Sequence, residues 1–92
     1  MNTVFLLLAQ FGARAIIPLD DVRREYFPHL EFNIMLRKIA LGEISIPVVK
    51  IESSQKSTRG VYVQDLADYI DERRAVAVKE RDQLCGLRQS RP

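Results

Sequence analysis

The sequence has very few of the residues that build disulfides, zinc sites and histidine-based catalytic centres. Its 92 residues include one cysteine, Cys85, one histidine, His29, and no tryptophan. One cysteine cannot close an intramolecular disulfide, and one cysteine with one histidine cannot supply the ligands of a structural zinc ion. The sequence also lacks a glycine-rich phosphate loop and a Ser/His/Asp set. We therefore expect a protein of the reducing cytoplasm that is not an enzyme and has no cofactor and no metal.

Long hydrophobic runs and a large net charge are missing as well. The apolar run at 4–9 is too short for a signal peptide or a membrane span. The apolar and charged fractions, 47% and 28%, are typical of a folded domain. The length fits one domain, which we expect at residues 1–85, followed by a flexible tail at 86–92. The formal net charge is only +2, so total charge alone does not indicate a nucleic-acid partner.

The basic charge is concentrated in the middle third of the chain. Residues 31–60 carry five basic and three acidic groups, whereas residues 1–30 carry three of each and residues 61–92 carry six of each. The whole positive excess therefore falls on one predicted helix and one predicted loop. This distribution favours a DNA-binding module that the remaining residues support.

Apolar residues at three- and four-residue steps predict four helices, at 3–12, 19–27, 31–41 and 64–84, with Thr3 as the N-cap of the first. The first helix is apolar on more than one side, and the last, at roughly 30 Å, is longer than the domain beneath it. The apolar surface of each helix must be buried, either against the other helix or against a second subunit. We favour a homo-oligomer formed through these two helices.

After Gly42 the apolar period changes from 3.6 to 2. Residues 48–52 and 61–63 predict the two strands of a hairpin, and the polar residues 53–60 predict a solvent-facing loop, a wing. Another short strand is expected at 15–17. Two helices joined by a short turn and followed by such a hairpin match the outline of a winged helix-turn-helix in a mainly helical α+β fold.

Side chains that can grip DNA occur on the second and third helices and on the wing. Arginine can hold a guanine edge with two parallel bonds and asparagine an adenine edge, so Arg37 and Asn33 are candidates for base contacts. Lysine and hydroxyl groups hold phosphate oxygens without reading sequence. The full set of candidate DNA-binding residues is Asn33, Arg37, Lys38, Lys50, Lys56, Ser57, Thr58, Arg59, Arg23 and Arg24.

Several short stretches between residues 1 and 80 are informative for the order of their residues rather than for their hydrophobic periodicity. They are Met1-Asn2-Thr3 with Phe5-Leu6-Leu7, Ile17-Pro18-Leu19 followed by two acids, Phe27-Pro28-His29-Leu30, Leu36-Arg37-Lys38, Gly42-Glu43-Ile44, Pro47-Val48-Val49 and Ser54-Gln55-Lys56-Ser57. Together they resemble the pyocin activator protein PrtN family. Residues 17–70 are similar, more distantly, to the winged helix-turn-helix of excisionase and MerR-like regulators.

The resemblance implies a bacterial or prophage-derived transcriptional activator. Such a protein would bind a short element upstream of phage-tail-like bacteriocin (pyocin) genes and turn them on after DNA damage. The expected partners are double-stranded promoter DNA, a second copy of the chain and, as a further candidate, RNA polymerase, with no membrane. Two alternatives stay open: a protein-interaction adaptor with an inert wing, and an excisionase-like architectural factor that bends DNA.

Overall fold

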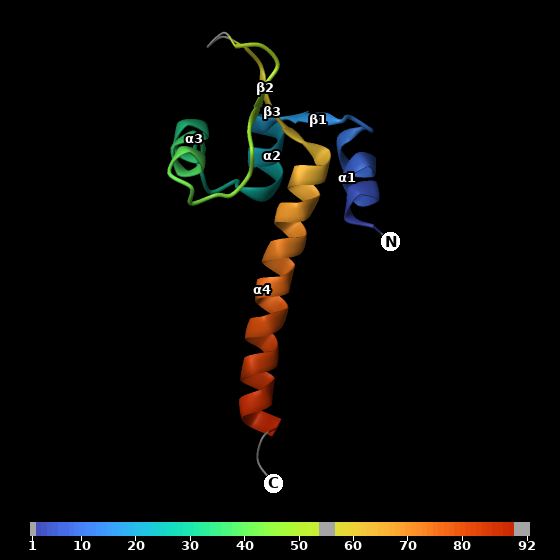
Figure 1. Ribbon diagram of the computed structural model, residues 1–92, viewed down its shortest axis with the longest axis vertical. Helices are drawn as coiled ribbons and strands as arrows, with labels where there is room; N and C mark the ends of the chain where they lie inside the picture. Colours follow the sequence, from blue (N-terminus) through green and yellow to red (C-terminus); the bar gives the residue numbers. More distant parts are fainter. Residues whose placement is uncertain (1, 54–56, 90–92) are drawn as a thin grey trace.

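The computed structural model describes residues 2–53 and 57–89, which form four α-helices and one three-stranded antiparallel sheet (Figure 1). In chain order the elements are α1 (Thr3–Phe11), β1 (Ile16–Pro18), α2 (Leu19–Tyr26), α3 (Phe32–Ala40), β2 (Val49–Lys50), β3 (Arg59–Tyr62) and α4 (Val63–Gln89). The predicted mainly helical α+β class, with an N-terminal helix and a long C-terminal helix, is confirmed.

The cap of α1 differs from the prediction. Asn2, not Thr3, is the N-cap, because Asn2 Oδ1 accepts a hydrogen bond from the Val4 backbone N–H at 2.7 Å. Asparagine caps helices at least as well as threonine, which leaves the Thr3 hydroxyl available to donate to Asp71 Oδ1 of α4 at 2.6 Å. Gly12, at φ 79°, ends the helix as predicted.

The turn between α2 and α3 is held by local hydrogen bonds. Pro28 has no N–H to continue the α2 ladder, and the Leu30 N–H donates to the Phe27 carbonyl oxygen at 3.0 Å. Glu31 is the N-cap of α3, where one of its carboxylate oxygens accepts from the Asn33 N–H at 3.3 Å. A carboxylate at this position also suits the positive end of the helix dipole.

The sheet has the strand order β1-β3-β2, with both neighbouring pairs antiparallel. Two predicted boundaries were wrong. β2 ends at Lys50, which leaves Ile51 63% exposed, and β3 begins at Arg59 rather than at residue 61. Gly60 explains the early start, because it pairs with Pro18 on one side and Val49 on the other.

Gly60 is required for the close approach of β1. A Cβ atom at this position would lie 2.5 Å from Ile16 Cγ2 and 2.9 Å from the Ile17 carbonyl oxygen. No side chain fits that space without a shift of strand β1. The glycine that the sequence suggested as the end of a loop therefore lies inside the sheet.

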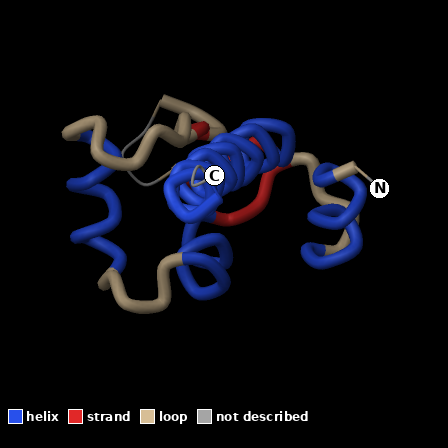
Figure 2. The backbone as a smooth tube through the Cα atoms, turned by 90° about the horizontal axis from the view of Figure 1, so that it is seen from below, coloured by secondary structure: helices blue, strands red, loops and turns tan. Residues whose placement is uncertain are grey.

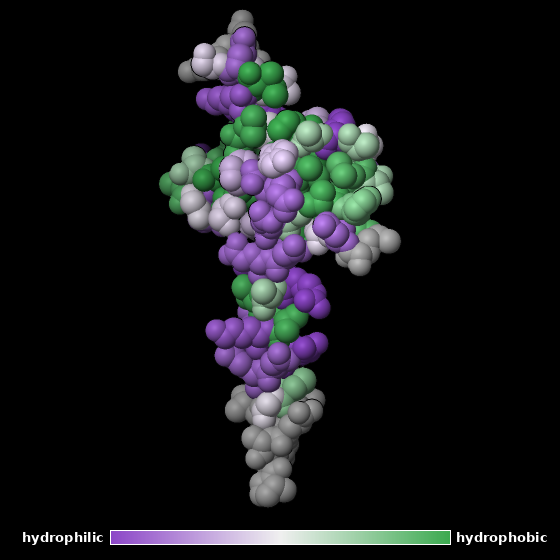
Figure 3. Space-filling view, turned by 45° about the vertical axis from the view of Figure 1, so that its right-hand side comes forward, coloured by the Kyte–Doolittle hydropathy of each residue, from purple (hydrophilic) through white to green (hydrophobic). Residues whose placement is uncertain are grey.

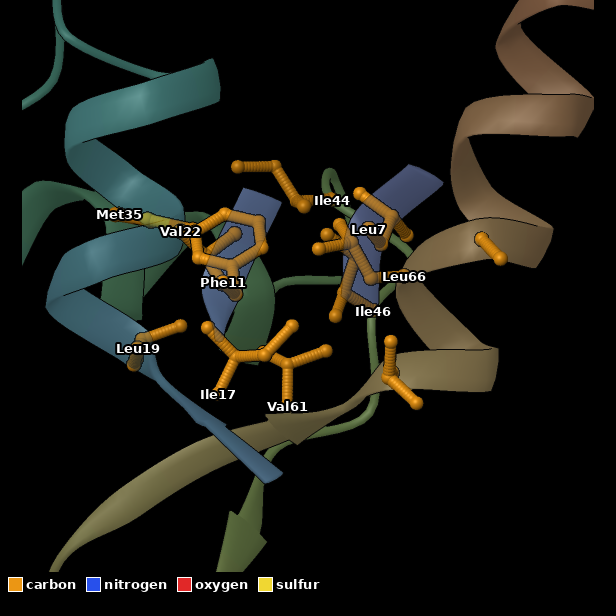
Figure 4. Close-up of a cluster of buried hydrophobic side chains, with 12 residues drawn as sticks. Leu7, Phe11, Ile17, Leu19, Val22, Met35, Ile44, Ile46, Val61 and Leu66 are labelled. Carbon is orange, nitrogen blue, oxygen red and sulfur yellow. The ribbon is translucent and has the colours of Figure 1, made fainter. Parts of the chain in front are cut away.

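The hydrophobic core lies between α1, α2, the inner face of the sheet and the first turns of α4 (Figure 4). Its buried residues are Leu7, Phe11, Ile17, Leu19, Val22, Met35, Ile44, Ile46, Val61, Val63, Leu66 and Ala67. Complete burial of an aliphatic side chain of this size contributes about 1.5 to 3 kcal/mol by its transfer out of water. Ile44 and Ile46 come from the irregular segment that follows α3, so this segment is anchored to the body at two points.

α4 begins directly after β3, and the Val63 N–H donates to the Ala15 carbonyl oxygen at 2.8 Å. The helix has 27 residues, about 40 Å at 1.5 Å per residue, in a molecule of 62 × 30 × 20 Å. It passes through Gly86 to Gln89, so the prediction that a tail starts at Gly86 was wrong. One glycine costs a helix only about 1 kcal/mol; residues 90–92 of that tail lie outside the described residues.

Candidate nucleic-acid interface

The α3 helix has one face that packs against the core and one that faces outward. Met35 is fully buried and Ile39 half-buried, whereas Asn33 and Arg37 are exposed one turn apart on the outward face, with Ile34, 44% exposed, beside them. Within residues 2–53 and 57–89, the Arg37 side chain forms no hydrogen bond and no ion pair. An arginine and an asparagine presented in this way have the exposure that contacts to base edges require.

Lys38 lies at the end of α3, where it is partly neutralised. Gly42, at φ 78°, ends the helix, and the Glu43 N–H donates to the Lys38 carbonyl oxygen at 2.8 Å in a Schellman-type cap. The side chains of the same two residues face each other, with Lys38 Nζ 3.7 Å from Glu43 Oε1. The lysine is 38% exposed, so a phosphate would have to compete with Glu43 for it.

Two further cations lie side by side on the hairpin formed by β2 and β3. Lys50 pairs directly with Arg59 in the antiparallel register, so their side chains leave the same face of the sheet. Neither has an acidic partner within 4.0 Å among the described residues. Like charges placed directly opposite each other repel and destabilise a strand pair, and a phosphate oxygen between them would reverse this repulsion.

The loop of this hairpin is organised by a hydroxyl group. Ser57 Oγ accepts from the Glu52 N–H at 2.8 Å and donates to the Thr58 carbonyl oxygen at 3.4 Å. The Ile51 N–H donates to the same Thr58 oxygen at 3.3 Å. Ser57 therefore links the two described ends of the loop, residues 51–52 and 57–58, whereas the Thr58 side chain is exposed. Lys56 lies outside the described residues.

Arg23 is engaged inside the fold. Its Nε donates to Asp20 Oδ1 at 2.8 Å and its Nη1 donates to the Leu30 carbonyl oxygen at 3.0 Å, and the side chain is 21% exposed. The hydrogen bond from Arg23 holds the pKa of Asp20 below its ordinary value. This arginine ties α2 to the turn before α3, a structural role that its sequence position alone does not reveal.

Arg24 is exposed but surrounded by acids. It pairs with Asp21, and its Nε lies 3.6 Å from Asp20 Oδ2. Arg14, next to β1, pairs with the same Asp21 at 3.3 Å. The arginines of α2 and its surroundings are thus neutralised locally, in contrast to Arg37 and to the pair on the hairpin.

The exposed basic groups are placed at the periphery of the body. α3 lies on the side of the body away from α1, and the hairpin projects at the end opposite the distal half of α4 (Figure 1). The side chains of Arg37 and of the Lys50–Arg59 pair therefore belong to two protruding elements.

Residues 2–53 and 57–89 contain no group of three or more His, Cys, Asp or Glu side chains that could hold a metal ion. None of the helices over the same residues combines the length and hydrophobicity that a membrane span requires.

Fold and surface together define a small, mainly helical α+β protein with an exposed basic set on one helix and one hairpin. The chain belongs to the pyocin activator protein PrtN family, whose family model it matches over residues 3–77. Comparison with curated proteins and with solved structures gives no significant match. Members of this family are transcriptional activators rather than enzymes, so membership implies a role as an activator of pyocin genes.

Proposed function

We propose that this chain activates pyocin genes by binding a short promoter element in double-stranded DNA as a winged helix-turn-helix. In this arrangement α2 and α3 form the helix pair, and the outward face of α3 carries the base contacts. The β2–β3 hairpin is the wing and holds phosphates.

One observation carries the proposal: the distribution of paired and unpaired cations. The arginines beside α2 are neutralised by Asp20 and Asp21. Within the described residues, Arg37, Lys50 and Arg59 have no acidic partner within 4.0 Å. Cations that the fold leaves without partners on an exposed helix and hairpin suit a polyanion, because binding there releases counterions without breaking internal ion pairs.

The candidate contact residues differ in how far other side chains already occupy them. Arg37 and Asn33 are the proposed base contacts, and Lys50, Thr58 and Arg59 the proposed phosphate contacts. Lys38 is a weaker candidate, because Glu43 competes for it. Arg23, Arg24 and Ser57 are better explained by the hydrogen bonds and ion pairs that they already make, and we no longer assign them to DNA.

The test compares two arginines that differ in their surroundings. Fluorescence anisotropy would measure binding of the wild type, Arg37→Ala and Arg24→Ala to a pyocin promoter fragment and to a scrambled fragment at one salt concentration. Loss of a base-reading arginine typically costs about 1 to 3 kcal/mol. We expect Arg37→Ala to lose this much affinity, mainly on the promoter fragment, and Arg24→Ala to bind as the wild type does. A wild type that does not discriminate between the fragments would reject the proposal.

An adaptor function is the second candidate, and one observation favours it. Phe5 is 69% and Leu6 53% exposed on the outer side of α1, which is a large apolar surface for a helix of nine residues. Either a second copy of this chain or RNA polymerase would cover such a face in an activator. In the anisotropy experiment, the adaptor function predicts that promoter and scrambled DNA bind equally weakly.

A further inference from the structure

The distal half of α4, residues 73–89, is largely uncovered within the described part of the chain, where the side chains of residues 73–86 are exposed apart from the half-buried Val78. At the start of α1, the Thr3 hydroxyl donates a hydrogen bond to Asp71 Oδ1 of α4. Below the body the helix projects alone (Figure 1), and Figure 2, which views α4 end on, shows α1, next to the N label, to one side of it. Apolar side chains nevertheless interrupt its hydrophilic surface (Figure 3), with Val76 36% and Leu84 66% exposed.

Leu84 continues an apolar stripe that begins in the body. Leu66, Ile70, Ala77 and Leu84 follow one another at steps of four, seven and seven residues, which places them along one side of the helix. In the body, the same side of α4 and the end of α2 enclose an apolar groove of about 300 Å³. The groove is lined by Tyr26, Phe27, Leu66, Tyr69, Ile70 and Arg73.

The charges along α4 indicate what covers this stripe. Residues 63–72 carry four acidic groups and no basic one, whereas residues 73–89 carry five basic and two acidic groups, a net charge of +3. The side-chain charge also changes sign between residues seven positions apart, since Glu72 is acidic and Lys79 basic, and Arg73 is basic and Glu80 acidic. Two such helices side by side and parallel would place like charges together, and two antiparallel helices would place opposite charges together.

We propose that two copies of this chain associate through antiparallel α4 helices, with the distal half of each helix lying in the groove between α2 and α4 of the other copy. The symmetry axis would pass between Val76 and Ala77, close to the middle of α4. Arg73 would then face Glu80 of the second copy, and Glu72 would lie level with Arg81 and within about 3 Å of Lys79 along the helix axis. This proposal rests on the homo-oligomer expected within the proposed function and specifies it further. The partner is a second copy of this chain, and the two α4 helices run antiparallel.

The same alignment fits the apolar residues. A centre between residues 76 and 77 brings Leu84 of the second copy next to Ile70, which lines the groove. The small Ala77 side chains would meet near the axis and allow the helices to approach each other closely. The whole length of α4, about 40 Å, would be paired.

The test uses cysteine cross-linking, because Cys85 is the only cysteine of the chain. In the antiparallel pair the two Cys85 residues would lie roughly 25 Å apart along the axis, beyond a short bismaleimide linker. In a parallel pair they would be neighbours. Ala77→Cys, combined with Cys85→Ser, brings the two thiols together at the proposed axis. Ala75→Cys in the same background is the matched control, because it lies on the opposite side of the helix.

The expected result is a covalent dimer for Ala77→Cys and none for the control or the wild type. Cross-linking of the wild type through Cys85 would establish a parallel pair and overturn the proposal. A monomer in light scattering, with no cross-linking of any variant, would overturn it as well. Neither outcome touches the DNA-binding proposal, which the anisotropy experiment decides separately.

A charge exchange provides a second readout that does not depend on thiols. Arg73→Glu and Glu80→Arg should each weaken the dimer by about tenfold, since each places like charges together. The double variant should restore wild-type association. In a parallel pair the exchange would leave the like-charge contacts unchanged in number, so the absence of both loss and rescue would contradict the antiparallel orientation.

Discussion

The substitution Gly60→Ala tests whether close strand packing holds the hairpin against the body. The added Cβ would lie 2.5 Å from Ile16 Cγ2 and 2.9 Å from the Ile17 carbonyl oxygen. The half-buried Ile16 side chain can rotate away, but the Ile17 oxygen is part of the β1 backbone, and moving it disturbs the pairing with β3. Overpacking of this kind typically costs about 1 to 3 kcal/mol, and we expect the free energy of unfolding to fall by that amount.

Urea unfolding followed by far-ultraviolet circular dichroism measures the effect, with the denaturant slope showing whether the transition is unchanged in kind. Gly86→Ala is the control, because a Cβ at Gly86 meets nothing within 4 Å. Alanine is the better helix former by about 1 kcal/mol, so this variant should be at least as stable as the wild type. A Gly60→Ala protein that unfolds at the wild-type urea concentration would refute the packing argument.

Two further predictions concern the ion pairs of α2. Arg23→Ala should lower the free energy of unfolding by about 1 kcal/mol, because it leaves the Leu30 carbonyl oxygen without its donor, whereas Arg24→Ala should change it by less than about 0.5 kcal/mol in the same urea experiment. Because the Arg23 hydrogen bond lowers the pKa of Asp20, the ionised carboxylate stabilises the folded state above its ordinary pKa. This contribution disappears as the pH falls through the lowered pKa. Asp20→Asn should therefore make the free energy of unfolding fall less steeply below about pH 4. The same decline in the variant and the wild type would contradict the stabilising role of the Asp20 carboxylate.

Sequence periodicity predicted the helices well, because their boundaries depend on local chemistry. Pro28 and Gly42 stop α2 and α3 where a proline and a left-handed residue must, and the inward position of Met35 follows from helical spacing alone. The long α4 was predicted for the same reason. Its extension past Gly86 was missed, because one glycine was given more weight as a helix stop than its cost in a helix justifies.

Features that depend on contacts between distant segments could not be predicted in this way. The start of β3 at Arg59 depends on Gly60 pairing with two strands at once, one of them 42 residues earlier in the chain at Pro18. The same register brings Lys50 and Arg59 opposite each other. Arg23 was expected at a DNA surface, and its contact with the Leu30 carbonyl oxygen depends on the path of a turn that no short-range pattern specifies.

The salt dependence of DNA binding tests the central claim most directly. The claim is that Lys50 and Arg59 on the hairpin, together with the outward face of α3, hold one duplex. A variant with both Lys50→Ala and Arg59→Ala should have a slope of log affinity against log salt that is less steep by about 1.8, since each phosphate contact contributes about 0.9. The double variant Arg14→Ala with Arg24→Ala loses the same total charge from residues that are already neutralised, and should keep the wild-type slope. Equal slopes for the wild type and both double variants would contradict the account, and so would a reduced slope in the second variant alone.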